Sequence, residues 1–301
     1  MERKILQLAD TTKAITLPRK WTIENSLKKG NTLEIEEHGT ALSINAIRKI
    51  DSKVTIDVAK LDQDLIWRYL IAAYRKGTKS ITIHFRNKKD LKILQQLTKD
   101  LLGMVVIRQY KNTLIMKDMF SDEKTNIDAS LKKIFTLLID LSDNALEAIK
   151  NNDKAGLENI PYQDFNINKF ANLSIRLLNI HGYKDIKKAY SVYKVISLLE
   201  EIGDEYRRLS SVYTRVGKKV NKDILEAFEG VNELLVSFNN LYYKFDKEKL
   251  REFYKKANNT LEKLKNSYKK NNSIEVQILS NLDTILHLIK NLSEENMVIK
   301  L

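Results

Sequence analysis

The stretch Ser197–Ser210 reads SLLEEIGDEYRRLS, and the spacing of its apolar residues predicts one face of a long amphipathic helix. Glu200 and Asp204 stand four residues apart. They therefore share a helix face, where two carboxylates repel each other unless a cation or an arginine neutralises them. Gly203 lies between them. Because glycine inside a helix costs about 1 kcal/mol relative to alanine, we expect a neighbouring helix or a site to approach it closely.

The region around this stretch is predicted to be helical from about residue 124 almost to the end of the chain, with apolar residues at intervals of three and four. Two sets of three helices, 124–215 and 222–293, each begin with an amphipathic helix that closes on an acidic turn, so an internal duplication is the economical explanation. The breaks between helices are expected near 151–161, 181–183, 217–222, 244–246 and 270–273.

The segment 54–117 alternates between two periods and predicts a small α/β domain. The order is VTIDV, a helix over 62–75, ITIHF, a helix over 88–101, MVVIRQY and TLIMK. Gly77 and Gly103 follow the two helices at the position where glycine commonly ends a helix. The chain has no G-x-G-x-x-G or Walker loop, so its sequence does not favour a nucleotide site.

The first fifty residues contain three short β-like runs, at 13–17, 32–36 and 41–44. Turn signals separate them at 29–31 and at His38-Gly39, and 21–27 predicts one helical turn that ends at Gly30. A segment this small buries too little apolar surface to fold comfortably alone, so we expect a dimer.

Pro18 lies in the run ITLPRKW, and the chain has only one other proline. Proline cannot donate a ladder hydrogen bond, so it is expected to end the preceding strand, while its fixed φ suits the first turn of a helix. Arg19 and Lys20 would then project from a rigid corner. The alternative is a structural turn with solvated charges.

Composition sets the broad class of the protein. The 301 residues suffice for two or three domains, and 52 Lys and Arg against 39 Asp and Glu give a formal charge of +13, which attracts polyanions. The absence of cysteine excludes disulfides, thiol nucleophiles and Cys-ligated zinc. MERKILQLAD lacks the apolar core of a signal peptide, and the run LIWRYLIAAY is short and carries Arg68, so we expect a cytoplasmic protein without membrane insertion.

The run ITLPRKWTIENSLKKGNTLEIEEHGTALSI resembles the AbrB/SpoVT swapped-hairpin domain over about residues 5–45, with Asn31 in place of the usual aspartate. The resemblance implies a homodimer in which two chains interleave hairpins into one β-barrel that binds double-stranded DNA. Some members of that family chiefly bind a protein partner instead. The DNA-binding residues it implies are Lys13, Arg19 and Lys20, with Arg3 and Lys4 as additions.

The run SLLEEIGDEYRRLS looks like the signature of the PhoU family, in which Glu, Ile, Gly and Asp stand in this order on the last helix of each three-helix repeat. The resemblance spans about residues 124–295, and the whole chain resembles an archaeal-type PhoU-like phosphate uptake regulator. Such proteins act through a phosphate transporter and its signalling partners, and several carry clusters of iron or zinc.

The resemblance implies a divalent metal (iron, zinc or magnesium) at Glu200 and Asp204, and a second site at Asp283 and His287, which stand at the matching positions of the second repeat, followed by Asn291. The acidic pairs of the middle helices keep one charged residue each. Divalent metals prefer several anionic or imidazole ligands, so a stable multinuclear cluster is not expected. Helix packing, or pairing of Asp204 with Arg208, is the alternative. The middle-helix pairs are Asp164 with Asn168 and Asn258 with Glu262.

These patterns predict a multidomain α+β protein with an AbrB/SpoVT-like domain at 1–50, a small α/β domain at 51–120 and a PhoU-like helical domain at 121–301. The predicted function is a DNA-binding transcriptional regulator of phosphate uptake that senses phosphate directly or through a partner. The alternative is an adaptor that does not bind DNA and regulates a phosphate transporter ATPase or a signalling protein by contact. We expect no enzymatic activity, because no nucleophile has a neighbouring base and no phosphate loop is present.

Overall fold

The computed structural model describes residues 2–38, 41–46, 52–119, 126–216, 220–268 and 273–301. Their contacts divide the chain into unit 1, Met1–Asp51, and unit 2, Ser52–Leu301. The predicted domain borders at 50/51 and 120/121 lie outside the described residues, as do the turn at Gly39 and parts of the breaks at 217–222 and 270–273. The three predicted domains therefore stay a prediction.

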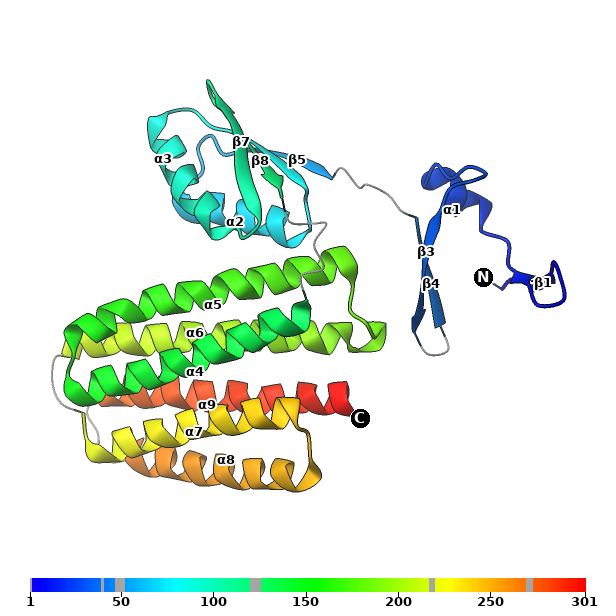
Figure 1. Ribbon diagram of the computed structural model, residues 1–301. Coiled ribbons are helices and arrows are strands. Elements are labelled where there is room, and N and C mark those ends of the chain that lie inside the picture. The colour runs from blue at the N-terminus through cyan, green and yellow to red at the C-terminus, as the bar shows by residue number, and fades with distance from the viewer. Residues whose placement is uncertain (1, 39–40, 47–51, 120–125, 217–219, 269–272) are drawn as a thin grey trace. The chain divides into compact units, whose positions relative to one another are not determined.

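Unit 1 has short elements (Figure 1), and two of them differ from the prediction. The predicted strand 13–17 stops at Ala14, and the helix begins at Arg19, directly after Pro18 with its φ of −62°. The helix also ends at Glu24 rather than at Gly30, because Ser26 takes a left-handed φ of 52° that no helix continues. The elements are β1 (Leu6–Gln7), β2 (Lys13–Ala14), α1 (Arg19–Glu24), β3 (Leu33–His38) and β4 (Ala41–Ala46).

The strands of unit 1 form two separate antiparallel pairs, β1 with β2 and β3 with β4. The single chain shows small open sheets, and the closed barrel that was predicted for two interleaved chains stays a prediction. Among the described residues of unit 1, none is buried.

Unit 2 begins with a four-stranded sheet in the order β5-β6-β8-β7, in which β5 and β6 are parallel and the other pairs antiparallel. Asp62 and Asn87 cap its two helices by accepting hydrogen bonds from first-turn N–H groups. The predicted alternation is confirmed, although the second helix closes as a 3₁₀ turn over Thr98–Asp100. The elements are β5 (Lys53–Asp57), α2 (Gln63–Arg75), β6 (Ser80–His84), α3 (Lys88–Leu97), β7 (Met104–Tyr110) and β8 (Thr113–Asp118). We call this part the sheet domain.

The rest of unit 2 is a bundle of helices that lie alongside one another (Figure 1), and α6 and α9 share its most extensive contact. The described residues confirm two sets of three long helices. The last helix runs to Lys300, past the predicted end at 293. The helices are α4 (Ile127–Asn151), α5 (Lys154–His181), α6 (Ala189–Val216), α7 (Lys222–Tyr243), α8 (Lys247–Tyr268) and α9 (Ser273–Lys300).

The predicted break at 151–161 is too long, because Pro161 lies inside α5. The chain turns over only two residues, where Asn152 adopts a left-handed φ of 53° and ends α4. Proline removes the hydrogen bond to the carbonyl of Leu157 but leaves the rest of the helix paired. Burial of Leu157, Ile160 and other side chains against the bundle offsets this loss.

Two separate apolar cores support unit 2, one inside the sheet domain and one inside the bundle. The two cores do not merge, and polar side chains make many of the contacts between the sheet domain and α5. Over the part of the chain that the structure describes, no helix combines the length and the apolar content needed to cross a lipid bilayer.

Candidate functional site

The carboxylates singled out in the sequence meet at the contact of α5 with α6. Gly203 of α6 makes this approach possible, since a Cβ built there would lie 2.8 Å from Oδ1 of Asp164 on α5. The expectation that a neighbouring helix closely approaches Gly203 is confirmed. Asp164 is only 2% exposed, which places a carboxylate in the interior of the bundle. A buried charge of this kind requires a partner.

Arg207 is the first such partner. Its Nε donates to Oδ2 of Asp164 at 2.9 Å, and its Nη2 donates to Oδ1 of Asp204 at 2.6 Å. One guanidinium thus joins the carboxylates of two helices. Arg208, the alternative partner considered for Asp204, forms an ion pair with it at 3.9 Å and also hydrogen-bonds Glu205.

Arg75 is the second partner, and it comes from α2 of the sheet domain. Its Nη2 donates to both carboxylate oxygens of Glu200, at 3.0 and 3.1 Å, while its Nε donates to Oδ1 of Asn172 at 2.6 Å. The two charged side chains are 29% and 24% exposed, so the pair lies partly out of water. Charge-assisted bonds of this kind are roughly twice as strong as neutral ones.

Burial dominates the protonation of these carboxylates. It raises the pKa of Asp164 to about 6, the nearby charge of Asp204 adds to the rise, and Arg207 opposes it. Burial also raises the pKa of Glu200 against the opposing effect of Arg75. Oδ1 of Asp164 and Oδ1 of Asn168 have no hydrogen-bond partner among the described residues. We call Asp164, Glu200 and Asp204 with these two arginines the carboxylate cluster.

The residues of the cluster do not fit a divalent metal as they stand. In the described ranges, no three His, Asp or Glu side chains are grouped so that they would ligate one ion. Both oxygens of Glu200, Oδ1 of Asp204 and Oδ2 of Asp164 accept hydrogen bonds from Arg75 and Arg207 instead. Two guanidinium groups already supply positive charge to three carboxylates, so a metal ion would have to displace them.

The second pair implied by the PhoU resemblance, Asp283 with His287, lies on α9. Nδ1 of His287 is 3.5 Å from Oδ1 of Asp283, and the two side chains are 54% and 37% exposed. Asn258, Glu262 and Asn291, which match the other family positions, are also exposed. Metal binding at this pair stays a prediction.

Arg176 was not identified from the sequence, although a lone cation in the apolar run ANLSIRLLNI was an available signal. It lies on α5 and is 2% exposed. Its guanidinium donates to the carbonyls of Tyr74 and Thr78, at 2.6 and 3.0 Å, and to Oδ2 of Asp118 at 2.5 Å. These acceptors all belong to the sheet domain.

Other polar contacts complete this junction. Lys169 of α5 is 3.8 Å from Asp100, and Nδ2 of Asn179 donates to the carbonyl of Arg75 at 2.7 Å. Gly77, with a φ of +86°, leaves room for Ile180, which a Cβ there would meet at 2.7 Å. Cationic and amide side chains of α5 therefore make much of the contact with the sheet domain, and the two apolar cores stay separate.

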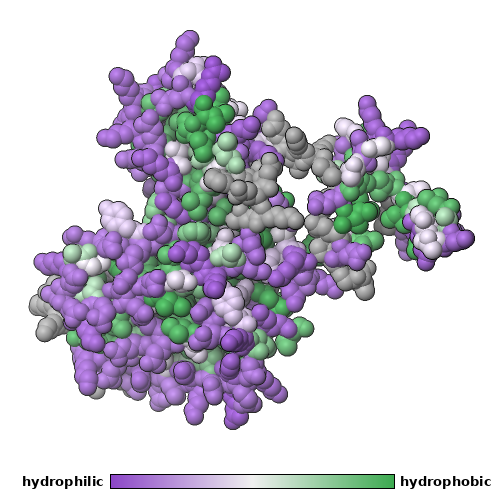
Figure 2. Space-filling model, in the orientation of Figure 1, coloured by the Kyte–Doolittle hydropathy of each residue, from purple (hydrophilic) through white to green (hydrophobic). Residues whose placement is uncertain are grey.

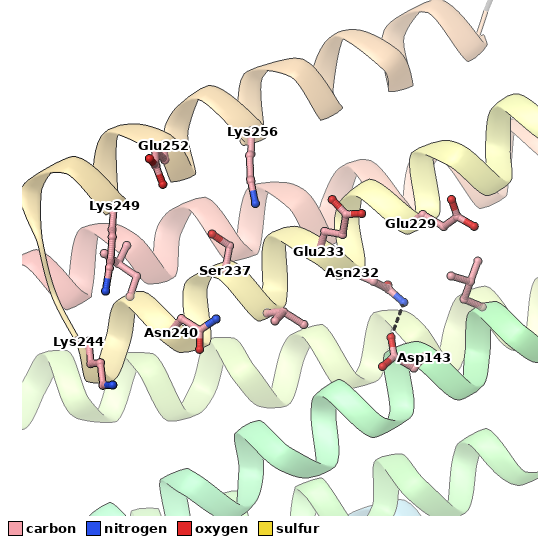
Figure 3. A pocket seen from close by; sticks show the side chains of 13 residues that line it. Asp143, Glu229, Asn232, Glu233, Ser237, Asn240, Lys244, Lys249, Glu252 and Lys256 are labelled. Atoms are coloured by element: carbon pink, nitrogen blue, oxygen red, sulfur yellow. Dashed lines mark hydrogen bonds between the residues drawn. The ribbon is translucent and has the colours of Figure 1, made fainter.

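A groove of about 710 Å³ runs between α4, α7 and α8 on the second half of the bundle (Figure 3). Lys249 and Lys256 point from α8 toward α7, and Asn232 lies at the end where α4 passes. Because its three lysines alternate with four acidic side chains, the groove does not concentrate positive charge as an inorganic anion would require. The charged residues of the groove are Asp143, Glu229, Glu233, Lys244, Lys249, Glu252 and Lys256.

All five residues predicted to contact DNA are exposed on unit 1. Arg19 and Lys20 form the first turn of α1, and Lys13 lies on β2. Nζ of Lys20 is 4.0 Å from Glu24, an exposed pair that contributes little to stability. Arg3 and Lys4 precede β1.

Comparison with known proteins gives one likeness. No protein-family model and no curated protein matches the chain. Among solved structures, the crystal structure of the phosphate transport system regulatory protein PhoU from Streptococcus pneumoniae is similar to 58% of this chain and 93% of that chain, with 17% sequence identity and a TM-score of 0.48. At this level the likeness carries no argument about function.

Proposed function

We propose that this protein is a transcriptional regulator of phosphate uptake, in which unit 1 binds double-stranded DNA as a homodimer. The helical bundle senses phosphate status, directly or through a partner such as a phosphate transporter ATPase or a signalling protein. The observation that carries the proposal is the apolar surface that unit 1 leaves exposed beside its cations.

That apolar surface is large for so small a unit. Figure 2 shows apolar residues gathered around the elements of unit 1. No described residue of this segment is buried, so the segment would gain stability by burial against another chain. The exposed aliphatic side chains are Ile5, Leu6, Leu8, Ile15, Ile23, Ile35 and Leu42, each between 46% and 69% exposed.

The register of the β3–β4 hairpin gathers apolar residues on one face. Ile35 pairs with Ile44 and Leu33 pairs with Ala46, and these positions alternate with polar ones along both strands. An isolated two-stranded hairpin is at best marginally stable in water. A second copy of the chain would cover this face, which is what the swapped-hairpin arrangement requires.

Dimerisation would double the exposed cations. Lys13, Arg19 and Lys20 from two chains would neutralise about six phosphates, so log K should fall with log salt with a slope of about −5. Unit 1 has nine basic and seven acidic residues. Its net charge is therefore small, and the case for DNA rests on the position of the cations.

The link to phosphate rests on the resemblance of SLLEEIGDEYRRLS and of the two three-helix sets to the PhoU family. The groove between α4, α7 and α8 mixes lysines with acidic side chains, so it does not identify a site for free phosphate. Both direct sensing and sensing through a protein partner therefore belong to the proposal.

The test is a mobility-shift assay with DNA from upstream of the protein's own gene. Arg19→Ala/Lys20→Ala should weaken the shift strongly, because four phosphate contacts are lost per dimer. Lys28→Ala/Lys29→Ala removes the same charge from exposed positions of the same unit and serves as the matched control. Equal effects of both double variants, or no shift by the unmodified protein at low salt, would contradict DNA binding through α1.

The groove between α4, α7 and α8 favours a second candidate, an adaptor that contacts a transporter ATPase or a signalling protein. Mixed charges along an open groove suit a polypeptide partner. In that case unit 1 only dimerises. An adaptor would retain the transporter ATPase in a binding assay and would give no mobility shift with DNA. The variant Lys249→Glu/Lys256→Glu should then lose the ATPase.

A further inference from the structure

We propose that the carboxylate cluster is a guanidinium site, in which Arg75 and Arg207 of the same chain take the place that a metal ion would occupy. Through Arg75, this site also fastens the sheet domain to the bundle. The inference concerns unit 2 alone, so it holds whether or not unit 1 binds DNA.

The hydrogen-bond geometry of Arg75 carries the first step. Its guanidinium bonds both oxygens of Glu200 through Nη2, and it uses Nε for Oδ1 of Asn172, which is 3% exposed. A planar group that holds Nε and Nη2 in one rigid fork matches this arrangement. A lysine ammonium is a compact charge on a flexible stem and lacks this fixed fork of donors.

Arg207, which lies on α6 itself, also joins two acceptors with one guanidinium. It uses two different nitrogens for Asp164 and Asp204, which belong to different helices. Three carboxylates thus face two guanidinium groups, and Arg208 lies 3.9 Å from Asp204. The remaining negative charge is too small to favour a divalent ion strongly.

The surroundings of Arg75 suit a flat cation. A cavity of about 250 Å³ adjoins Arg75 and Glu200, and its apolar walls are formed by Trp67, Ile71 and Phe165 among others. Guanidinium has weakly hydrated faces that pack on apolar and aromatic groups, with its edges turned to carboxylates. Truncation of Arg75 would leave room here for a small guanidinium compound.

The test uses chemical rescue in the intact chain. Arg75→Ala should lower the Tm of unit 2, and millimolar methylguanidinium should restore most of the loss. Ammonium chloride and urea at the same concentrations should not restore it. Addition of Glu200→Gln to the variant should abolish the rescue, and Arg68→Ala, an exposed arginine on the same helix, should neither lose Tm nor respond to methylguanidinium.

Two results would overturn the proposal. One is a Tm of Arg75→Ala that responds to methylguanidinium no more than to ammonium chloride. The other is stoichiometric binding of Zn²⁺, Mn²⁺ or Mg²⁺ to the unmodified protein that disappears in Glu200→Gln.

Arg75→Lys keeps the proposal testable if Arg75→Ala does not fold. Lysine supplies the charge without the planar donors. It should lower the Tm, whereas a Tm equal to that of the unmodified protein would show that a point charge suffices and would overturn the proposal.

Discussion

Unit 1 and unit 2 differ in what their arginine and lysine side chains contact. In unit 2, Arg75, Arg176 and Arg207 bond the chain's own carboxylates and carbonyls. In unit 1, Arg19 and Lys20 stand exposed on a segment that has no buried residue among those described. Unit 2 thus pairs these cations within its own chain, whereas the described residues of unit 1 leave both apolar and cationic side chains exposed.

We expect the largest effect from a variant that changes the exposed apolar face of the β3–β4 hairpin in unit 1. Ile35→Asp places a charge at the centre of the hairpin face that a second copy would cover. We expect a monomer and a loss of DNA affinity by at least about 100-fold, since phosphate contacts from one chain are lost. Sedimentation and mobility shift measure the two effects. Thr32→Asp, at an exposed position beside the hairpin, is the control and should remain dimeric.

Arg176→Ala tests the buried junction between α5 and the sheet domain in unit 2. It removes the guanidinium from Asp118 and from the carbonyls of Tyr74 and Thr78, all at a buried junction. Loss of one partner of a buried ion pair costs about 3 to 5 kcal/mol. Urea unfolding of the intact chain should show this loss, and Arg68→Ala should stay within about 0.5 kcal/mol of the unmodified protein. A loss as small as that of Arg68→Ala would mean that this junction contributes little.

The raised pKa of Asp164 predicts that the free energy of unfolding depends on pH. Its pKa in the folded protein, about 6, exceeds the ordinary value of 3.8, so the folded state binds the proton more tightly. The stabilisation is complete below about pH 4 and is lost as pH rises through 6. Relative to Asp164→Asn, the unmodified protein should lose roughly 2 kcal/mol of unfolding free energy between pH 4 and pH 7.

The check is urea unfolding of both proteins across this range. Glu201→Gln, at an exposed neighbouring position, should show no such trend. A difference between Asp164→Asn and the unmodified protein that is constant with pH would contradict the raised pKa.

Gly203→Ala has the smallest expected effect. The new Cβ would lie 2.8 Å from Oδ1 of Asp164, while alanine favours the helix by about 1 kcal/mol, so we expect a net loss of roughly 1 to 2 kcal/mol. Thermal unfolding should show a lower Tm. In an Asp164→Ala background the loss should shrink, because the clash is removed; an unchanged loss would place the cause elsewhere.

The sequence predicted the elements of unit 2 well because local signals determine them. Gly77 and Gly103 both take the left-handed φ expected after a helix, and the alternation of VTIDV and ITIHF predicted two strands, which the structure pairs in parallel. Pro161 was misread because a local rule predicted a break where tertiary packing keeps the helix. In unit 1, the left-handed Ser26 ended α1 early, and no sequence signal marked it.

The carboxylate cluster was only half predictable. Glu200, Gly203 and Asp204 share one helix face and could be found by spacing, and an arginine was foreseen as one way to neutralise them. Arg75 could not be identified as that arginine, because 125 residues separate it from Glu200. Periodicity along a helix contains no information about a cation that a separate domain supplies.

The most direct test of the contrast between the two units is sedimentation equilibrium of the intact chain at micromolar concentration. The chain has a mass of 35.0 kDa. If unit 1 is completed by a second copy, the measured mass will be twice this value and will return to that of one chain in Ile35→Asp. A mass of one chain for the unmodified protein would contradict the account.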